Sequence, residues 1–166
     1  MNDKALKTLE YIKIRDRLMA MALSPMGKEK CEVLEPVSDI DIIKREQRET
    51  TEAVNMALKK GRLPLGGIKD IRTQLGRAEA GGVLGIDELM AVGEFLYVCR
   101  KIKNYAKQEN KADAFPILED YFEIVQTINS LENEITRCIL NEQELSDDAS
   151  NGLRTVRREI KNANAG

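Results

Sequence analysis

The sequence predicts an all-α fold, and three observations carry that prediction. Apolar residues recur at helical spacing with charged residues between them, as at Leu6, Leu9 and Ile12. Strand signals are nearly absent, because the chain has no alternating β-branched run and no Asn-Gly turn. Apolar residues make up 42% of the 166 residues but aromatic ones only 4%, so the core must be aliphatic. We therefore expect a bundle of roughly seven or eight helices, as one domain or one large piece of a longer protein.

Proline, glycine and polar turns divide the predicted helices. The first covers 4–22, and Ser24-Pro25 begins a second that runs to about Leu34. Ser38 is the predicted N-cap of the third helix, which ends near Lys60. Further helices are expected over 68–78, 86–107, 117–129 and 131–140, with a loop over 144–152.

The carboxyl end of the sequence has the pattern of a coiled-coil arm. Its apolar seam follows 3-4-3 spacing and consists of Leu153, Val156, Ile160 and Ala163. We predict a helical core domain over 1–145 and the start of an arm over 146–166, where the arm is cut short or ends in a linker.

Basic residues form stripes on several predicted helices. One stripe lies beside the apolar seam and consists of Arg154, Arg157, Arg158 and Lys161. Others lie near the ends of two earlier helices, at Lys59, Lys60 and Arg62 and at Arg100, Lys101, Lys103 and Lys107. Such side chains contact phosphates in nucleic-acid-binding proteins, but they also cap helix C-termini or simply face water. Because the net charge is −2, we favour the structural interpretation and keep the stripe at 154–161 as the candidate nucleic-acid contact.

The chain lacks the residues that most reactions need. It has no histidine, and its cysteines at 31, 99 and 138 form no CxxC pair, so a catalytic triad and a zinc site are not expected. The cysteines are expected to be buried apolar residues of a protein in the reducing cytoplasm, and no run is long enough for a membrane span. Asp147-Asp148 with Glu142 or Glu144 could hold a hard cation, but helix capping explains them better. We predict no catalytic residue, cofactor or metal site in this chain.

The stretch LPLGGIKDI, residues 63–71, poses the main question of function. Gly66-Gly67 before a helix could offer free N–H groups to a phosphate. A P-loop, however, needs a preceding strand and a Lys-Ser/Thr pair, and neither is present here. Turn formation between two helices is the better interpretation.

The same stretch carries a resemblance to a known family. LPLGGIKDIRTQLGRAEAGGVLGIDEL, residues 63–89, is similar to the amino-terminal region of the second bacterial MutS family, whose members lack the mismatch-reading domains and end in a small Smr nuclease domain. TLEYIKI, SPMGKE, LEP, RETTEA and DDASNGLRTVRREI resemble family segments in the same order. The family usually has proline where Asn151 stands. The resemblance covers nearly the whole chain.

The resemblance implies a core or connector domain with the root of a lever arm. Members of the family are homodimeric ATPases whose levers reach a clamp that grips nucleic acid. ATP and Mg²⁺ would bind in an ATPase domain, and cleavage would occur in a nuclease domain, both carboxyl-terminal to this chain. The family is implicated in suppressing recombination at branched DNA and in splitting collided ribosomes. The expected partners are the ATPase domain, a second protomer, and branched DNA or the ribosome, with no membrane.

Within this family the chain would transmit movement rather than catalyse. The glycine stretch would then be an interdomain joint, formed by Pro64, Gly66, Gly67, Asp70 and Arg72. Two other functions remain open from the residues alone. The chain could be a stand-alone nucleic-acid-binding or ribosome-binding module that uses its basic stripe. Alternatively, it could be a protein-interaction adaptor whose polar seam around Gln47 and Thr50 receives a partner helix.

Overall fold

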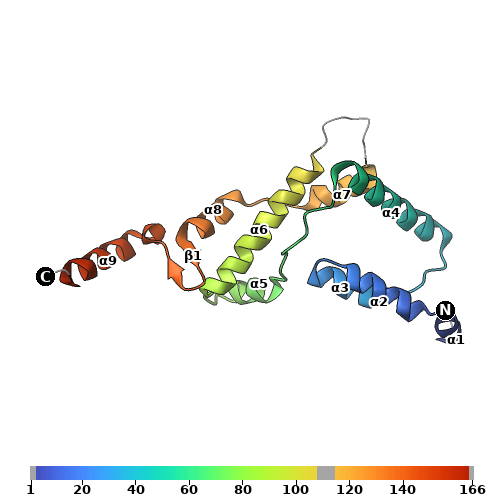
Figure 1. Ribbon diagram of the computed structural model, residues 1–166, viewed down its shortest axis with the longest axis horizontal. Helices are drawn as coiled ribbons and strands as arrows, with labels where there is room; N and C mark the ends of the chain where they lie inside the picture. The colour runs from blue at the N-terminus through green and yellow to red at the C-terminus, as the bar shows by residue number, and fades with distance from the viewer. Residues whose placement is uncertain (1–2, 108–114, 165–166) are drawn as a thin grey trace. The chain divides into compact units, whose positions relative to one another are not determined.

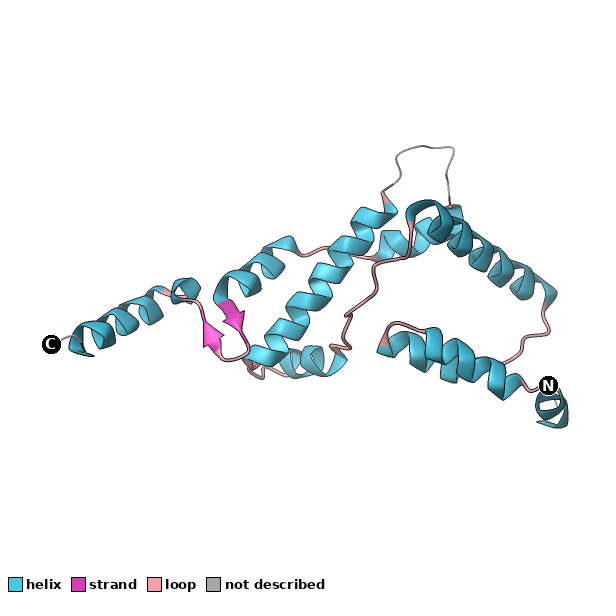
Figure 2. Cartoon of the chain, in the orientation of Figure 1, coloured by secondary structure: helices cyan, strands magenta, loops and turns pink. Residues whose placement is uncertain are grey.

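The structure is a computed structural model that describes residues 3–107 and 115–164 (Figure 1). Its contacts divide the chain into two compact units, each built from two separate segments. The first unit comprises Met1–Asp70 and Val98–Gln126, and the second comprises Ile71–Tyr97 and Thr127–Gly166. The all-α prediction is confirmed in the described residues, apart from one small hairpin (Figure 2). The predicted division at residue 145 stays a prediction.

The first unit contains α1 to α4, α7 and the last turns of α6. Their bounds are Asp3–Thr8, Tyr11–Met21, Pro25–Glu32 and Ile40–Lys60 for α1 to α4, Pro116–Ile124 for α7, and Ile86–Ala106 for α6. The helix predicted over 4–22 is broken, because Glu10 takes a left-handed conformation with φ 52° between α1 and α2. Ser24 caps α3 as predicted, with its Oγ 3.0 Å from Gly27 N. The N-cap of α4 is Asp39 and not Ser38, since the Asp39 carboxylate accepts from Asp41 N and Ile42 N.

The second unit contains α5, the first turns of α6, α8, a hairpin, a 3₁₀ turn and α9. Their bounds are Arg72–Glu79 for α5, Asn129–Cys138 for α8, Ile139–Asn141 for β1, Glu144–Leu145 for β2, Asp147–Ala149 for the 3₁₀ turn and Asn151–Asn164 for α9. The antiparallel pairing of β1 with β2 was not predicted. The loop predicted over 144–152 was therefore wrong in part, because it contains β2, the 3₁₀ turn and the start of α9.

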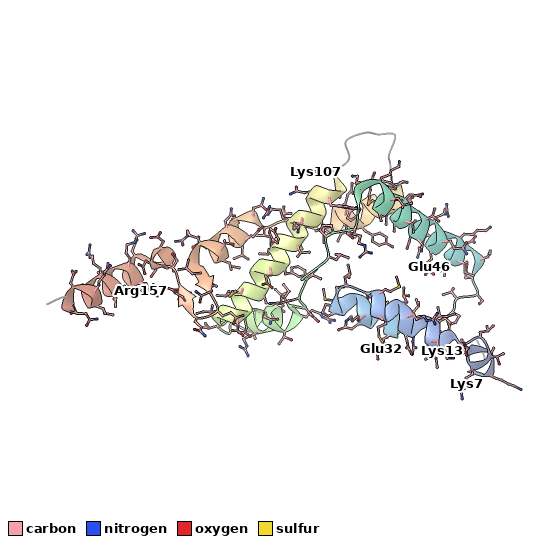
Figure 3. The ribbon with its side chains drawn as sticks, viewed as in Figure 1. Lys7, Lys13, Glu32, Glu46, Lys107 and Arg157 are labelled. Atoms are coloured by element: carbon pink, nitrogen blue, oxygen red, sulfur yellow. The ribbon has the colours of Figure 1, made fainter. Side chains whose placement is uncertain are left out.

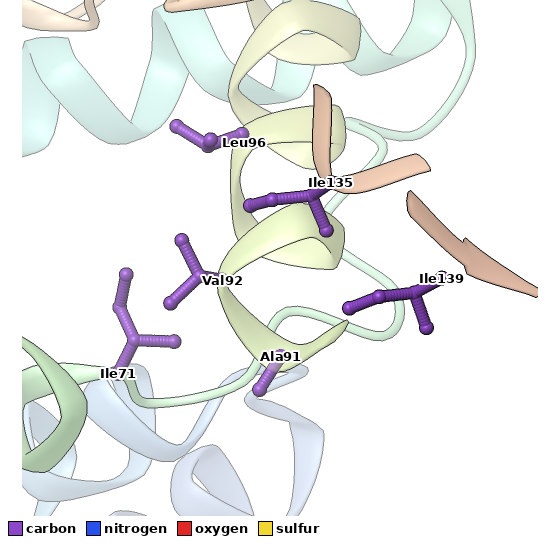
Figure 4. Packing of buried hydrophobic residues seen from close by; sticks show 6 residues of the cluster. All are labelled: Ile71, Ala91, Val92, Leu96, Ile135 and Ile139. Atoms are coloured by element: carbon purple, nitrogen blue, oxygen red, sulfur yellow. The ribbon is translucent and has the colours of Figure 1, made fainter. Parts of the chain in front are cut away.

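Each unit has its own aliphatic cluster. In the second unit Val92 and Leu96 of α6 pack with Ile135 of α8, joined by Ile71, Ala91 and Ile139 (Figure 4). The helices approach closely there, since a Cβ added to Gly93 would lie 3.0 Å from Ile135 Cγ2. In the first unit the cluster consists of Met56, Val98, Ile102, Phe115 and Phe122. Along α6, Ala91, Val92 and Leu96 belong to the cluster of the second unit, and Val98 and Ile102 belong to the cluster of the first.

Charged side chains complete helix ends within the first unit. The Glu52 carboxylate of α4 accepts from Ile117 N and Leu118 N at 3.0 and 3.2 Å, which satisfies the amino terminus of α7 behind Pro116. Lys103 Nζ donates to the carbonyl of Phe122 at 2.8 Å, near the carboxyl end of α7. These contacts connect α4, α6 and α7 through groups that helices otherwise leave unpaired.

The cysteines differ in burial. Cys99 is buried, and burial raises the pKa of its thiol. Cys31 and Cys138 are only half-buried, so the prediction of buried cysteines holds for one position.

Candidate functional site

The basic stripe predicted at the carboxyl end lies on one face of α9. The helix begins after Ser150, whose Oγ accepts from Leu153 N at 3.1 Å. From there the 3.6-residue repeat places the four basic residues together, beside Asp147 around one surface hollow: Arg154, Arg157, Arg158 and Lys161. Figure 3 shows Arg157 on this helix. The sequence pattern alone found this set of basic residues.

Two of the four basic residues are paired with acids of the preceding 3₁₀ turn. Arg154 forms an ion pair with Asp148, and Arg157 forms one with Asp147. Arg157 also donates to the carbonyl of Leu145 in β2 at 2.9 Å. These pairs differ from the capping role predicted for the two acids. No local pattern indicates them, because spacings of six and ten residues cross a turn. The root of α9 is therefore held to the hairpin and to the turn.

A third arginine ties the turn to α8. Arg137 donates to the carbonyl of Asp148 and forms an ion pair with Glu134 one turn earlier in α8. The hydrogen bond from Arg137 lowers the pKa of the Glu134 carboxyl below its usual range. Arg137 and Arg157 thus fix the acidic turn from two helices, and a movement of α9 at its root would displace contacts of α8.

Arg158 and Lys161 differ from their neighbours on the stripe. Within the described residues, neither has an ion pair, and both are exposed. These two side chains are the cations that this face offers to an outside anion. The nucleic-acid contact itself stays a prediction.

The apolar seam of α9 is open. Val156 and Ile160 are 51% and 55% exposed, and Leu153 is half-buried. An exposed apolar stripe on a helix of this kind is typical of a surface that pairs with another helix.

The glycine pair of the quoted stretch forms a turn. Ile68 N donates to the carbonyl of Leu65 at 3.4 Å, and Gly67 has φ 83° at the third position of that turn. This position of a type II turn requires positive φ, which glycine adopts without strain. Because α5 begins only at Arg72, the helix predicted from residue 68 starts four residues late, and Gly66-Gly67 does not open it. The prediction that Gly66-Gly67 forms a turn is therefore confirmed, and the pair does not form a phosphate-binding start of a helix.

The other residues of the predicted joint are Pro64, Asp70 and Arg72, of which the first two belong to the first unit and the last to the second. Leu63, Leu65 and Ile68 pack on the apolar cluster of the first unit, and Pro64 between them is half-buried. Asp70 is the last residue of this segment of the first unit, and Arg72 follows the first residue of the second. Asp70 and Arg72 therefore flank the boundary between the units along the sequence, whereas Pro64, Gly66 and Gly67 belong to the first unit. Their role as an interdomain joint stays a prediction.

Three lysines of the other basic clusters make contacts within the first unit. Lys60 and Lys103 donate to carbonyls at helix ends, and Lys59 Nζ lies 5.6 Å from the centre of the Phe115 ring. The structural interpretation of these clusters is correct for the three lysines.

The polar seam of α4 borders a groove in the first unit. Gln47 and Thr50 line it together with Tyr11, Pro36 and Ile43. Thr50 Oγ1 donates to Glu46 O at 2.9 Å, so its hydroxyl is satisfied within its own helix. Partner binding in this groove stays a prediction.

The described residues contain no cluster of three or more His, Cys, Asp or Glu side chains arranged to hold a metal ion. No helix among them is both long and apolar enough to cross a membrane. These are the findings for residues 3–107 and 115–164 only.

The described residues are helical apart from one small hairpin, α9 carries an exposed apolar seam, and the sequence is similar to a known class of protein. No family model matches the chain. Along 99% of its length it is 42% identical to endonuclease MutS2 of Lachnoclostridium phytofermentans. It is 37% identical to endonuclease MutS2 of Alkaliphilus oremlandii over 99% of its length, and 39% identical to that of Acetivibrio thermocellus over 98%. The chain spans about a fifth of these relatives, 21% of each. The resemblance to the second MutS family is confirmed.

Proposed function

We propose that this chain is a non-catalytic segment of a MutS2-type protein that transmits movement through α9. In the longer protein, α9 would begin the lever that connects a nucleotide-hydrolysing domain with a nucleic-acid clamp. Nucleotide state would then reach the clamp as a rigid-body displacement of helices. The longer protein would act in the cytoplasm as a dimeric ATPase and endonuclease on branched DNA or on the ribosome. ATP and Mg²⁺ would bind outside this segment.

The observation that carries the proposal is the anchoring of α9 at its root. Arg157 holds the helix to β2 and to Asp147, and Arg137 holds the adjoining turn to α8. Meanwhile the seam at Val156 and Ile160 is exposed and available to a second helix. A helix that is fixed at one end and free along its apolar side has the form of a lever.

The test is to weaken the anchor in the full-length protein. Arg157→Gln is expected to reduce the stimulation of ATP hydrolysis by nucleic acid several-fold and to leave basal hydrolysis unchanged. Arg17→Gln is the control, because it removes the same charge at an exposed position of α2, outside both the anchor and the basic stripe. Equal effects of the two variants would count against transmission through the root of α9.

A second function is favoured by a separate observation. Arg158 and Lys161 are exposed cations on the stripe without an ion pair in the described residues, so this segment could contact phosphates itself. Binding of the 166-residue chain to a nucleic-acid duplex, weakened by Arg158→Glu with Lys161→Glu, would support it. Binding that is the same in both proteins would exclude this face.

A further inference from the structure

We infer that Asp147 and Asp148 act as an internal competitor for nucleic-acid phosphates on the basic face of α9. This inference rests on the second proposed function, the contact of that face with nucleic acid. The two carboxylates occupy guanidinium groups that a phosphate would otherwise use. The basic face would therefore bind a nucleic-acid backbone weakly until phosphates replace these carboxylates as partners of the arginines.

The position of the acids supports the competition. Asp147 lines the same hollow as the four basic residues, so its charge lies inside the surface that a phosphate would approach. Asp148 pairs with Arg154 at the edge of that surface. Four cations and two carboxylates meet on this face, which leaves about two net positive charges for a ligand.

The pairs are exposed enough to exchange. The side chains of Arg154 and Asp148 are 59% and 61% exposed, and those of Arg157 and Asp147 are 37% and 66% exposed. Exposed ion pairs contribute little net free energy, so replacement of a carboxylate by a phosphate costs little. A guanidinium group donates hydrogen bonds to a phosphate as it does to a carboxylate.

The two arginines are expected to exchange differently. Arg157 has a second acceptor, the carbonyl of Leu145, which keeps it on the hairpin even when Asp147 is displaced. Arg154 pairs with Asp148 across the turn and is more exposed. Arg154 should therefore turn to a phosphate first, while the root of α9 stays anchored by Arg157.

The test compares variants of the 166-residue chain, in which carboxylates are replaced by amides, for binding to a fluorescein-labelled duplex of about 20 base pairs, as DNA and as RNA. Asp147→Asn with Asp148→Asn is expected to bind about tenfold tighter than the wild type at low salt. Its slope of log affinity against log salt should be steeper by about 1 to 2, because up to two further phosphates are neutralised. Asp148→Asn alone, which keeps the Arg157 pair, should give about half of that change in slope.

The control is Glu142→Gln with Glu159→Gln, which changes the net charge equally at exposed positions outside the hollow. Equal tightening by this control would overturn the inference, because it would show a general charge effect. No tightening by the aspartate variants would also overturn it, and wild-type binding would then still support the second proposed function. Absence of binding by every protein would reject both. Tightening on DNA alone would assign DNA as the ligand, and tightening on both duplexes would assign the shared phosphate backbone.

Discussion

Lys60 and Tyr105 each complete the end of the other's helix. Lys60, the last residue of α4, donates through Nζ to the carbonyls of Tyr105 and Lys107 at 3.2 and 2.9 Å. Tyr105, near the end of α6, donates through its hydroxyl to the carbonyl of Gly61 at 2.6 Å, just past the end of α4. The Lys60 ammonium also lies 5.9 Å from the centre of the Tyr105 ring. Carbonyls that the two helices cannot satisfy internally are thus satisfied across the contact.

The first prediction is that both partners stabilise this contact. Tyr105→Phe removes the hydroxyl donor and should lower the free energy of unfolding by about 1 kcal/mol. Burial raises the pKa of Tyr105, so the hydroxyl stays a donor well above neutral pH. Urea unfolding followed by circular dichroism measures the change. Lys60→Met should have a similar effect, whereas Lys44→Met, at an exposed position of the same helix, should have little. Equal effects of the two lysine changes would show that charge and not capping matters.

The second prediction concerns Glu52, which caps α7 from a different helix. Glu52→Ala leaves two backbone donors without their acceptor and should destabilise the first unit by about 1 to 2 kcal/mol. Glu52→Gln keeps an oxygen acceptor and should cost less. Hydrogen exchange of the Ile117 and Leu118 amides measures the loss directly. Exchange that stays as slow in Glu52→Ala as in the wild type would contradict the assignment, and Glu46→Ala, an exposed position of α4, is the control.

The third prediction gives opposite effects on stability to Gly76 inside α5 and Gly81 just past its end. Gly81 N donates to Ala78 O and Gly82 N donates to Arg77 O, both at 2.9 Å, which is the hydrogen-bond pattern of a Schellman motif with Gly81 at φ 78°. Gly81→Ala should destabilise the protein by about 1 kcal/mol, because a side chain is strained at this φ. Gly76→Ala, inside α5 with open space around it, should stabilise by up to about 1 kcal/mol. The same sign for both changes in thermal unfolding would contradict this.

The fourth prediction is a pH dependence from Glu134. Its pKa lies below the ordinary value of 4.5 because Arg137 donates to the carboxylate. A carboxyl whose pKa is lower in the folded state contributes stability that is present above the unfolded pKa and is lost as the pH falls through the folded one. NMR titration of the Glu134 side-chain carbon should show the lowered midpoint. Arg137→Gln should move it up towards the ordinary value, whereas Lys161→Gln should not. An unchanged midpoint in Arg137→Gln would mean that another group holds the shift.

Sequence patterning predicted the elements whose signals are local. Ser24-Pro25 placed the start of α3, Gly61 placed the end of α4, and the apolar period of α6 placed both of its ends within a residue. The failures have long-range or weak causes. Glu10 breaks the first helix without any glycine or proline nearby. The hairpin has strands of three and two residues, too short for alternation to show.

The candidate site was predictable as a stripe but not as a set of contacts. Helical spacing is enough to place Arg154, Arg157 and Lys161 on one face. The acids that neutralise two of the arginines come from a turn whose direction no local pattern sets. Asn141 gave one missed signal, since its side chain accepts from Gln143 N at 2.9 Å and makes a turn of the kind that closes hairpins.

Because each unit is built from two separate segments of the chain, neither apolar cluster can be completed early in synthesis. Met56 and Leu63 leave the ribosome long before Phe115 and Phe122, the residues that complete their cluster. The segment Ile71–Tyr97 is synthesised in the interval. Its own cluster remains incomplete until Ile135 and Ile139 have been made. Neither cluster can be completed while only half of the chain has been made. The apolar side chains of both clusters are therefore exposed during the same stage of synthesis. A ribosome pause before residue 115 would therefore hold both halves in their most aggregation-prone form.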